Sequence, residues 1–466
     1  MKQVKQRTLL IYILLILFVA GLVLYTARYV ALGSRWASFP GNLSAYDSDI
    51  PVLGQILDRS GVVLYDAAQG AYSDDDTLRR ATLHAVGDRE GNISTSALQS
   101  FQKQLIGYSL LGRVYLTLDS RLQTAAYEAL NGANGTIGVY NYQTGEILCM
   151  VSSPSFDPAD PPEIRDGDTQ YDGVYLNRFL SSAFTPGSVF KVVTAAAALE
   201  KLEGVASRTF HCSGSVTIGG DTITCPYVHG DMDFYGAMAN SCNCVFAQLA
   251  VELGGDTLSS YAQQAGLLDG GSVSGIDTAA GTYVISENDS EVGWSGVGQY
   301  EDLANPCALM TMMGAIAGRG SAREPYLLGK VTSMTGTAAR STGTSGTMHL
   351  WNADTCQALA QQRHGNLWPE PLWRPAGVRQ IRHRRGGAGQ GAPQLVCRIR
   401  GQRRPPPGLC SAGGKRRRRQ RRSRQRRSPG AAHGGRAAVS ALLRLPRIGR
   451  GSVTAGPYQL FSLLFS

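Results

Sequence analysis

Acidic side chains are almost missing from the end of this 466-residue chain. Residues 363–466 contain a single acid, Glu370, but 24 of the 45 lysines and arginines. That segment therefore carries a net charge of +23, whereas the preceding 362 residues carry −13, and the whole chain carries +10. Because the two signs are segregated along the sequence, a uniformly basic protein is excluded. The basic tail needs an explanation of its own.

Charged residues are also absent from residues 9–24, which read LLIYILLILFVAGLVL. With the two residues that follow, this run has about the length that crosses a bilayer. Three basic residues precede it, so the positive-inside rule predicts a cytoplasmic tail over residues 1–8 and a single-pass membrane anchor over 9–28. The rest of the chain would then lie on the extracytoplasmic side. A cleaved signal peptide is the alternative, but the apolar run is longer than a usual signal core and no clear cleavage site follows it.

Nine cysteines in an exported chain could form disulfides. Cys212 and Cys225 flank a segment that predicts a β-hairpin turning at Gly219 and Gly220. The spacing is compatible with a disulfide across this hairpin and equally with two thiols that only pack together. The sequence shows no cluster of metal ligands, and we expect neither a metal nor a cofactor.

The region after the anchor divides into a small mixed segment and a larger α+β segment. Residues 29–113 predict a small domain, here called the pedestal, with two short strands around a turn at Ser60 and Gly61. A larger segment, residues 114–362, follows it. Its patterns predict a strand at 114–119, a helix at 120–130, a hairpin joined at 143–145, and helices around 237–253, 258–265 and 303–317.

A serine and a lysine lie three residues apart at the start of an Ala-rich helix. Residues 184–191 read FTPGSVFK, in which Pro186 and Gly187 punctuate the chain just before Ser188. Residues three apart share a helix face, so the Lys191 amine can approach the Ser188 hydroxyl. An amine held neutral by burial can then take the hydroxyl proton. Taken alone the pattern is weak, because so short a motif is common by chance.

A second polar motif follows about fifty residues later. Ser241, Cys242 and Asn243 precede an apolar, helix-like run. A hydroxyl and an amide two residues apart in a loop can point into one cleft. Taken alone, the pattern is more typical of an N-cap at Asn240 or Ser241 for the helix that follows.

Together these features resemble the penicillin-binding proteins, specifically the monofunctional class B transpeptidases of bacterial wall synthesis. The resemblance rests on an anchored chain with P-G-S-x-x-K at a helix start and S-x-N further on. It extends to residues 116–126, similar to the family's opening segment, to 144–158, similar to its first hairpin and exit, and to 294–299, similar to its approach to later helices. No glycosyltransferase domain is recognised between anchor and pedestal, which disfavours a bifunctional class A enzyme.

The resemblance implies a fold and a set of partners. The fold would be α+β: a transpeptidase domain similar to the serine β-lactamases, with an antiparallel sheet and helices on both sides, joined to the pedestal. The partners would be peptidoglycan stem peptides, β-lactams and the cell membrane. A polytopic glycosyltransferase is the usual kind of protein partner in this family.

The resemblance also implies a role for each motif residue. Ser188 would attack the carbonyl of the penultimate D-alanine of a stem peptide and form an acyl-enzyme, while Lys191 accepts its proton. Ser241 would relay that proton to the departing D-alanine. Asn243 would hold Lys191 and the substrate amide, and the Ser188 N–H would form half of the oxyanion hole. An amine of a neighbouring stem peptide would then take the acyl group, and β-lactams would acylate Ser188 as substrate mimics.

Two other functions use the same motifs. A β-lactamase would hydrolyse the acyl-enzyme instead of passing it to an amine, but the anchor, the pedestal and S-x-N favour the transpeptidase. A non-catalytic β-lactam receptor would be expected to have several membrane spans, whereas the sequence shows one.

The third motif of the family, Lys-Ser/Thr-Gly on a strand that lines the cleft, is absent, because neither KSG nor KTG occurs in the chain. With suitable codons, residues 379–387, RQIRHRRGG, read one base later give GKSGTAEV, which resembles the missing motif. The same offset converts residues 394–400, QLVCRIR, into SWFVGF, similar to the following strand. We therefore expect that the chain leaves its ancestral frame after about residue 362.

The frame hypothesis predicts that residues 363–466 are a disordered, out-of-frame tail. The sheet would then lack its cleft-lining strand and the one after it, and the chain as written could be inactive. The alternative is a genuine basic extension, in which residues 416–427 would be typical of a patch for nucleic acid or an anionic surface. An exported chain meets little nucleic acid, so we expect no nucleic-acid partner.

Overall fold

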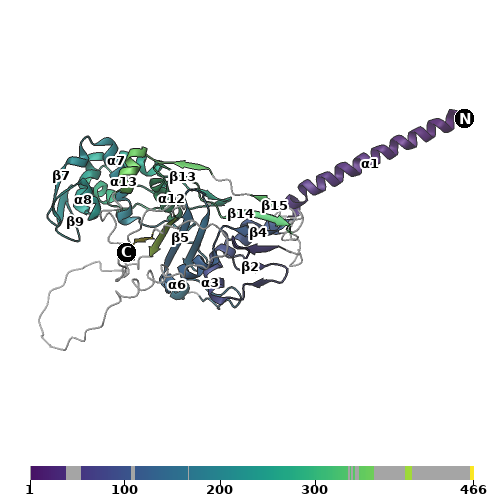
Figure 1. Cartoon of the computed structure of the whole chain (residues 1–466), viewed down its shortest axis with the longest axis horizontal. Helices are drawn as coiled ribbons and strands as arrows, with labels where there is room; N and C mark the ends of the chain where they lie inside the picture. Colours follow the sequence, from purple (N-terminus) through teal and green to yellow (C-terminus); the bar gives the residue numbers. More distant parts are fainter. Residues whose placement is uncertain are drawn as a thin grey trace, which may run out of the picture.

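The computed structural model describes residues 2–37, 54–105, 111–165, 167–333, 336, 339–341, 346–361, 394–400 and 462–465. One long helix, α1 (Lys2–Ala37), projects from the body of the protein (Figure 1). Its segment Ile11–Arg28 has a mean hydropathy of 2.2 and no part of it is buried. By length and composition this helix is compatible with the membrane anchor expected at residues 9–28.

The first sheet joins N-terminal strands to strands from much later in the chain. Its order is β15-β14-β4-β1-β2-β3. The strands are β1 (Gln55–Leu57), β2 (Val63–Asp66), β3 (Ala71–Tyr72), β4 (Leu111–Leu116), β14 (Leu328–Ser333) and β15 (Ala339–Ser341). β4 runs parallel to β1 and antiparallel to β14. A boundary at residue 113 therefore does not separate the sheets, and the division into pedestal and transpeptidase domain stays a prediction.

The second sheet lies at the centre of the α+β part and has the order β18-β17-β5-β6. β5 (Gly135–Asn141) and β6 (Ile147–Ser153) form the hairpin predicted around residues 143–145, and both are buried throughout. Ile137 and Val139 pack under α6 (Ser120–Leu130), whereas the Tyr140 hydroxyl donates to a carbonyl of α12 (Pro306–Ala317). Alternate residues of a strand point to opposite faces. Helices thus cover both sides of this sheet, which confirms the predicted architecture.

Two strands of this sheet come from the segment expected to be disordered. β17 (Gln394–Arg400) pairs antiparallel with the whole of β5, and β18 (Ser462–Phe465) pairs parallel with β17. The prediction that the tail contributes no strand is therefore wrong for these two segments. Their sequences contain apolar and β-branched residues that suit a strand, and β5 offers an open edge of backbone donors and acceptors. Residues 379–387 and 416–427 lie outside the described residues.

A cluster of helices forms the other half of the body (Figure 1). At its centre lies α7 (Lys191–Lys201), which packs against α9 (Asn243–Leu253), α10 (Gly255–Gln264) and α13 (Ala353–Gln361). Four consecutive alanines make α7 thin enough for three neighbours to approach it, and its first eight residues are buried. The other helices described are α3 (Asp76–Val86), α4 (Ala97–Ser100), α5 (Gln102–Leu105), α8 (Phe234–Ala239) and α11 (Asp289–Gly296).

Short antiparallel pairs of strands border this helical half. They are formed by β7 (Thr209–Cys212) with β10 (Gly230–Asp233), β8 (Ser215–Ile218) with β9 (Asp221–Thr224), β11 (Ser272–Val273) with β12 (Ile276–Asp277), and β13 (Ser321–Arg323) with β16 (Thr347–His349). The β8–β9 hairpin turns at Gly219 and Gly220, as predicted. Both glycines have positive φ angles, of 57° and 90°, which the turn requires.

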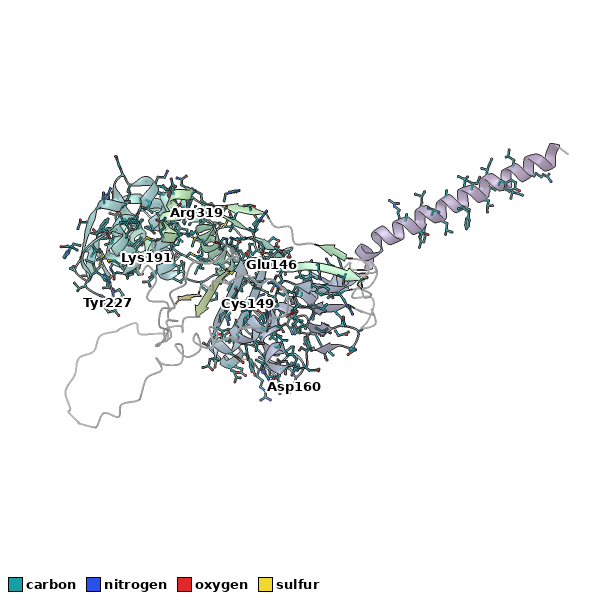
Figure 2. All side chains as sticks on the ribbon, in the orientation of Figure 1. Glu146, Cys149, Asp160, Lys191, Tyr227 and Arg319 are labelled. Carbon is teal, nitrogen blue, oxygen red and sulfur yellow. The ribbon has the colours of Figure 1, made fainter. Side chains whose placement is uncertain are left out.

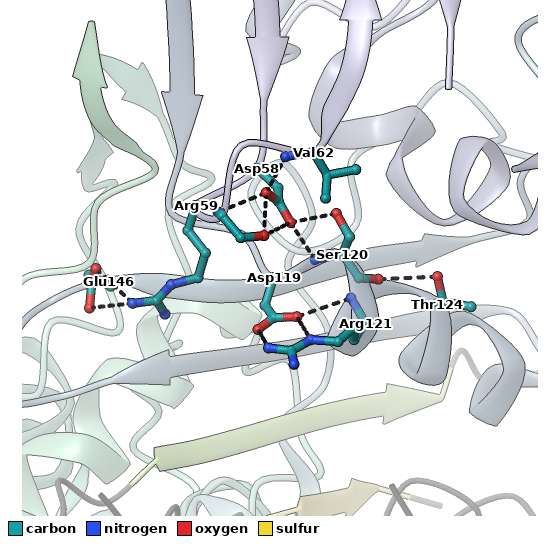
Figure 3. A network of polar contacts seen from close by, with 9 residues as sticks. Asp58, Arg59, Val62, Asp119, Ser120, Arg121, Thr124 and Glu146 are labelled. Carbon is teal, nitrogen blue, oxygen red and sulfur yellow. Dashed lines mark hydrogen bonds and ion pairs between the residues drawn. The ribbon is translucent and has the colours of Figure 1, made fainter. Parts of the chain in front are cut away.

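A polar network ties the turn after β1 to the start of α6 (Figure 3). The buried Asp58 carboxylate accepts hydrogen bonds from the Val62 N–H at 2.9 Å and from the Ser120 N–H and hydroxyl at 3.2 and 2.7 Å. Burial acts to raise the pKa of Asp58, but these hydrogen bonds outweigh it and lower the pKa. Arg59 pairs with Glu146 at 3.3 Å in the same network. The N-terminal turn is thereby fixed to the β5–β6 hairpin.

Candidate active site

Ser188 and Lys191 meet at the turn into α7. Ser188 lies in the 3₁₀ turn η3 (Gly187–Val189) and is exposed, whereas Lys191 is 4% exposed. The Lys191 Nζ donates a hydrogen bond of 3.2 Å to Ser188 Oγ. Figure 2 shows Lys191 within the helical half, away from α1. An accessible hydroxyl is thus held against a buried amine, as the spacing of three residues predicted.

The S-x-N motif lies on the other side of the same amine. Lys191 Nζ donates to Ser241 Oγ at 3.0 Å, to the Ser241 carbonyl at 2.7 Å and to Asn243 Oδ1 at 2.6 Å. The structure therefore brings all four predicted residues, Ser188, Lys191, Ser241 and Asn243, around one nitrogen.

The backbone at Ser241 turns this motif towards the lysine. Ser241 has a φ of 49°, a left-handed conformation that is uncommon for a residue other than glycine. The chain therefore breaks there into α8 and α9, where the sequence predicted one helix over residues 237–253. The alternative of a side-chain N-cap is wrong, because Cys242 is the N-cap of α9 and makes no such bond. Asn240 instead donates to the Gly236 carbonyl.

Burial changes the proton affinity of the amine. It lowers the pKa of Lys191 to about 8, and the nearby thiols of Cys225, Cys242 and Cys244 oppose this shift. With a pKa near 8, about a tenth of the amine is neutral at pH 7. A neutral amine is the form that can accept a proton from a hydroxyl.

Two glycines beyond the motifs hold the Ser188 turn in place. The Gly187 N–H donates to the Gly298 carbonyl at 2.9 Å, and the two backbones are so close that a Cβ on Gly298 would lie 2.2 Å from the Gly187 oxygen. One turn into α7, the Thr194 hydroxyl donates to the Gly296 carbonyl at 2.7 Å. The sequence analysis assigned no role to Gly296 and Gly298. The pattern that could have indicated one is the pair of glycines two residues apart in WSGVGQ, residues 294–299.

A buried carboxyl lies just beyond α11. Asp302 is 1% exposed and accepts a hydrogen bond of 3.2 Å from the Ser295 hydroxyl. Burial raises the pKa of Asp302 to about 7, although the bond from Ser295 acts in the opposite direction. The sequence offered no signal for this group, because a single aspartate in a polar stretch is ordinarily exposed.

The thiols near the motif form a cluster that the sequence did not predict. Cys212 and Cys225 are free, so they pack without a disulfide. Together with His229 and Cys242 they place four ligand atoms within 4.8 Å of one another. The prediction that no group of metal ligands exists is therefore wrong. The missed signal was the combination of Cys225 and His229, four residues apart, with Cys212 before them and Cys242 after them.

Comparisons with known proteins agree with this geometry. Residues 135–356 match the family model of the penicillin binding protein transpeptidase domain, and all four site residues lie inside the match. Peptidoglycan D,D-transpeptidase PbpA of Mycobacterium tuberculosis is 29% identical over 249 residues, which cover 47% of this chain and 49% of that protein. The chain thus spans about half the length of this curated relative.

Solved structures share the fold. The D,D-transpeptidase domain of a peptidoglycan glycosyltransferase from Eggerthella lenta has a TM-score of 0.59 at 26% identity, covering 66% of this chain and 80% of that one. Penicillin-binding protein A from M. tuberculosis, in a penicillin G acyl-enzyme complex, has a TM-score of 0.57 at 22% identity with the same coverage. The matched domain, the relatives and the shared fold show that this chain contains a penicillin binding protein transpeptidase domain and is similar to the class B penicillin-binding proteins.

Proposed function

We propose that this protein is a peptidoglycan D,D-transpeptidase that works through an acyl-enzyme on Ser188. The observation that carries the proposal is the position of Lys191 Nζ, which lies 3.2 Å from the Ser188 hydroxyl and 3.0 Å from the Ser241 hydroxyl. One group can therefore take a proton from the nucleophile and pass it to a second hydroxyl. Relatives named as D,D-transpeptidases support this assignment.

The acylation step follows from these contacts. A neutral Lys191 keeps two N–H donors for the Ser241 carbonyl and Asn243 Oδ1, its two shortest contacts, and offers its lone pair to Ser188. As Ser188 Oγ bonds to the carbonyl carbon of the penultimate D-alanine, its proton passes to Lys191. The amine then returns a proton through Ser241 to the nitrogen of the terminal D-alanine. The C–N bond breaks, D-alanine leaves, and Ser188 carries the acyl group as an ester.

The second half-reaction reverses the proton path. The amine of a neighbouring stem peptide attacks the ester carbonyl, and its proton returns to Ser188 Oγ as the C–O bond breaks. A new amide is formed and the free serine is restored. In both steps the Ser188 N–H would donate to the developing oxyanion, while Asn243 would orient the substrate amide.

β-Lactams would acylate the same serine. Their strained amide mimics the D-Ala-D-Ala terminus, and the relative from M. tuberculosis is described as an acyl-enzyme with penicillin G. An exposed Ser188 beside a buried base is the arrangement that this reaction needs.

The proposal extends to where the reaction takes place. We assign residues 1–8 to the cytoplasm, 9–28 to the anchor and the rest to the extracytoplasmic side, because three basic residues precede the apolar helix. Peptidoglycan stem peptides would be the substrates there. A polytopic glycosyltransferase would be the partner that supplies the glycan strands.

The out-of-frame origin of residues 363–466 also belongs to the proposal. It is supported by the lack of KSG and KTG in the chain and by the shifted reading of residues 379–387. The test is to sequence the coding DNA and its transcript. Codons in this segment that do not give GKSGTAEV one base later would overturn the idea, and a frame-corrected chain should be acylated faster than the chain as written.

A fluorescent penicillin tests the main proposal on the full chain in detergent. Persistent covalent labelling is expected, and Ser188→Ala should abolish it. Ser260→Ala, which removes an exposed hydroxyl on α10, is the matched control and should label normally. Rapid release of the label would support a β-lactamase instead. A folded chain that does not label, together with a frame-corrected chain that does not label, would overturn the transpeptidase assignment.

A further inference from the structure

Three cysteines and one histidine from four separate positions converge beside the S-x-N motif. Cys212 ends β7, Cys225 follows β9, His229 precedes β10 and Cys242 precedes α9. Cys212 and Cys242 are fully buried, whereas Cys225 and His229 are half-buried. Their four ligand atoms all lie within 4.8 Å of one another.

Backbone hydrogen bonds hold these ligands together without help from their side chains. In the β7–β10 pair, Cys212 lies opposite Gly230, so His229, the residue before Gly230, lies next to Cys212. The Cys225 N–H donates to the Gly214 carbonyl at 2.9 Å, which closes the base of the β8–β9 hairpin next to Cys212. The loop between Cys225 and His229 passes through Tyr227 at the outer edge of the molecule (Figure 2). Secondary structure thus presents three of the four ligands in a fixed arrangement.

The spacing of the ligand atoms fits a tetrahedral ion. Zinc bonds of about 2.3 Å to sulfur and about 2.0–2.1 Å to nitrogen place two sulfurs about 3.8 Å apart, and a sulfur and a nitrogen about 3.5 Å apart. Here Cys225 Sγ lies 3.9 Å from Cys242 Sγ and 3.5 Å from His229 Nδ1. A disulfide would need sulfurs about 2.05 Å apart. The cluster therefore has the dimensions of a metal site.

We propose that Cys212, Cys225, His229 and Cys242 form a structural Zn²⁺ site. Three thiolates and one imidazole are soft and borderline ligands, which suit zinc and exclude magnesium and calcium, whose ligands are oxygens. Four protein ligands fill a tetrahedral shell, so the ion would be closed to substrate. The site would therefore support the fold and would not take part in the reaction.

The zinc site would position the groups around Lys191. Cys242 lies between Ser241 and Asn243, both of which accept a hydrogen bond from Lys191. Cys225 follows Thr224, whose carbonyl accepts a hydrogen bond of 2.8 Å from Asn243 Nδ2. An ion that links Cys225 to Cys242 would therefore fix the position of Asn243 and of the Thr224 carbonyl to which Asn243 donates. This consequence for acylation rests on the proposed function, whereas binding of the ion does not.

A fourth thiol, Cys244, lies against the cluster. Its sulfur is not among the four ligand atoms that all lie within 4.8 Å of one another. It lies one residue inside α9, whereas Cys242 precedes the helix. We assign Cys242 as the ligand and Cys244 as a contact outside the metal shell.

Metal content of the full chain, purified in detergent under reducing conditions and without chelators, tests the site. Elemental mass spectrometry should find about one zinc ion per chain. Cys225→Ala and His229→Gln should lose it, whereas Cys149→Ala, at a buried free cysteine in β6, should retain it (Figure 2). Wild-type protein without zinc, or with a disulfide between any of these cysteines, would overturn the proposal. Zinc lost in Cys244→Ala but kept in Cys242→Ala would overturn the ligand set.

A second measurement guards against variants that fail to fold. Wild-type chain stripped by a chelator is titrated with Co²⁺, and the intense visible absorption of tetrahedral thiolate-bound cobalt is followed. His229→Gln changes a half-buried residue, and with an unchanged circular dichroism spectrum it should bind at least about tenfold more weakly. Equal affinities would contradict the site.

Penicillin labelling of the same samples separates the two proposals. The stripped wild-type chain should label more slowly, and added Zn²⁺ should restore the rate, because Ser241 and Asn243 regain their positions. Zinc binding without labelling of any form would leave the metal site standing and count against the transpeptidase. Labelling of a chain that is purified without zinc, at a rate that added Zn²⁺ does not change, would do the reverse.

Discussion

The Lys191 ammonium nitrogen lies 2.6 Å from the side-chain oxygen of Asn243, and the amide nitrogen of Asn243 lies 2.8 Å from the Thr224 carbonyl. One neutral side chain thus joins the buried amine to the end of β9. Because the amide carries no charge, it holds Lys191 in place without cancelling the effect of burial on its pKa, which stays near 8. The choice of asparagine at this position therefore bears directly on whether Lys191 can act as a base.

Asn243→Asp should slow acylation at pH 7. A carboxylate in contact with an ammonium favours the charged form and shifts a pKa by about 1–3 units, so the pKa of Lys191 would rise and less neutral amine would remain. We expect a rate of labelling by fluorescent penicillin at least about tenfold lower at pH 7, with partial recovery at higher pH.

The matched control is Asn240→Asp, the same change three residues earlier. Asn240 is exposed and bonds to the Gly236 carbonyl, away from Lys191. Its labelling rate should stay within about twofold of the wild type. An Asn243→Asp variant with the wild-type rate and pH profile would show that Asn243 does not set the protonation of Lys191.

Acylation of the wild-type protein should rise with pH. Lys191 accepts a proton only when it is neutral, and its pKa is about 8. The neutral fraction grows from about a tenth at pH 7 to about nine tenths at pH 9, so the second-order rate should rise about tenfold and be half-maximal near pH 8. The acylation rate is measured by quenching the labelling reaction at set times from pH 6.5 to 9.5, and circular dichroism verifies that the protein stays folded. A flat profile would exclude Lys191 as the base.

Gly298→Ala should damage the Ser188 turn. Gly298 has a φ of 73°, and its Cβ would lie 2.2 Å from the Gly187 carbonyl oxygen. Strain and the forced shift should lower the free energy of unfolding by about 2 kcal/mol or more and slow acylation. Gly61→Ala is the control, because Gly61 has a φ of 95° but nothing within 4 Å of an added Cβ. Equal penicillin labelling of the two variants would show that contact with Gly298 does not position Ser188.

Asp302→Asn should stabilise the protein at high pH. The pKa of Asp302 is raised to about 7 in the folded state, so between its unfolded pKa near 4 and pH 7 the folded state binds more protons than the unfolded state. The contribution of Asp302 to the free energy of unfolding therefore falls as the pH rises from about 4 to 7, and it stays low above pH 7.

In Asp302→Asn the side chain has no titratable carboxyl, so its contribution to stability does not change with pH. Its free energy of unfolding relative to the wild type should grow by about 2–3 kcal/mol between pH 5 and pH 8. Thermal unfolding at the two pH values measures the difference, with Asp160→Asn, at an exposed carboxyl (Figure 2), as the control that should show none. A constant difference would mean that Asp302 is not protonated in the folded state.

Local patterns in the sequence were enough to find the groups to which we assign the reaction. Ser188 and Lys191 share a helix face because they are three residues apart, and the hairpin β5–β6 follows from two apolar runs around a Gly-containing turn. The helix α6 begins at the predicted residue for the same reason, since Asp119 caps it locally. Such features depend on neighbours in the chain, which a sequence displays directly.

Features that depend on distant segments could not be predicted. Gly298 meets Gly187 only because α11 folds back on α7, and Asp302 is buried only because other elements cover it. The strand β17 was expected to be disordered, because its basic surroundings in the sequence conceal an alternating pattern that the open edge of β5 can accept. Burial and pairing of this kind are properties of the assembled protein.

The sequence by itself determined the pairing of Ser188 with Lys191 and the apolar N-terminal helix, because residue type and short spacing suffice for each. Only the tertiary structure decided that Ser241 and Asn243, some fifty residues on, contact the same amine, and that three thiols and His229 gather behind them. The physical reason is that a proton relay or a metal shell requires contacts of a few ångströms between segments far apart in the chain. Those contacts form when the helices and hairpins pack.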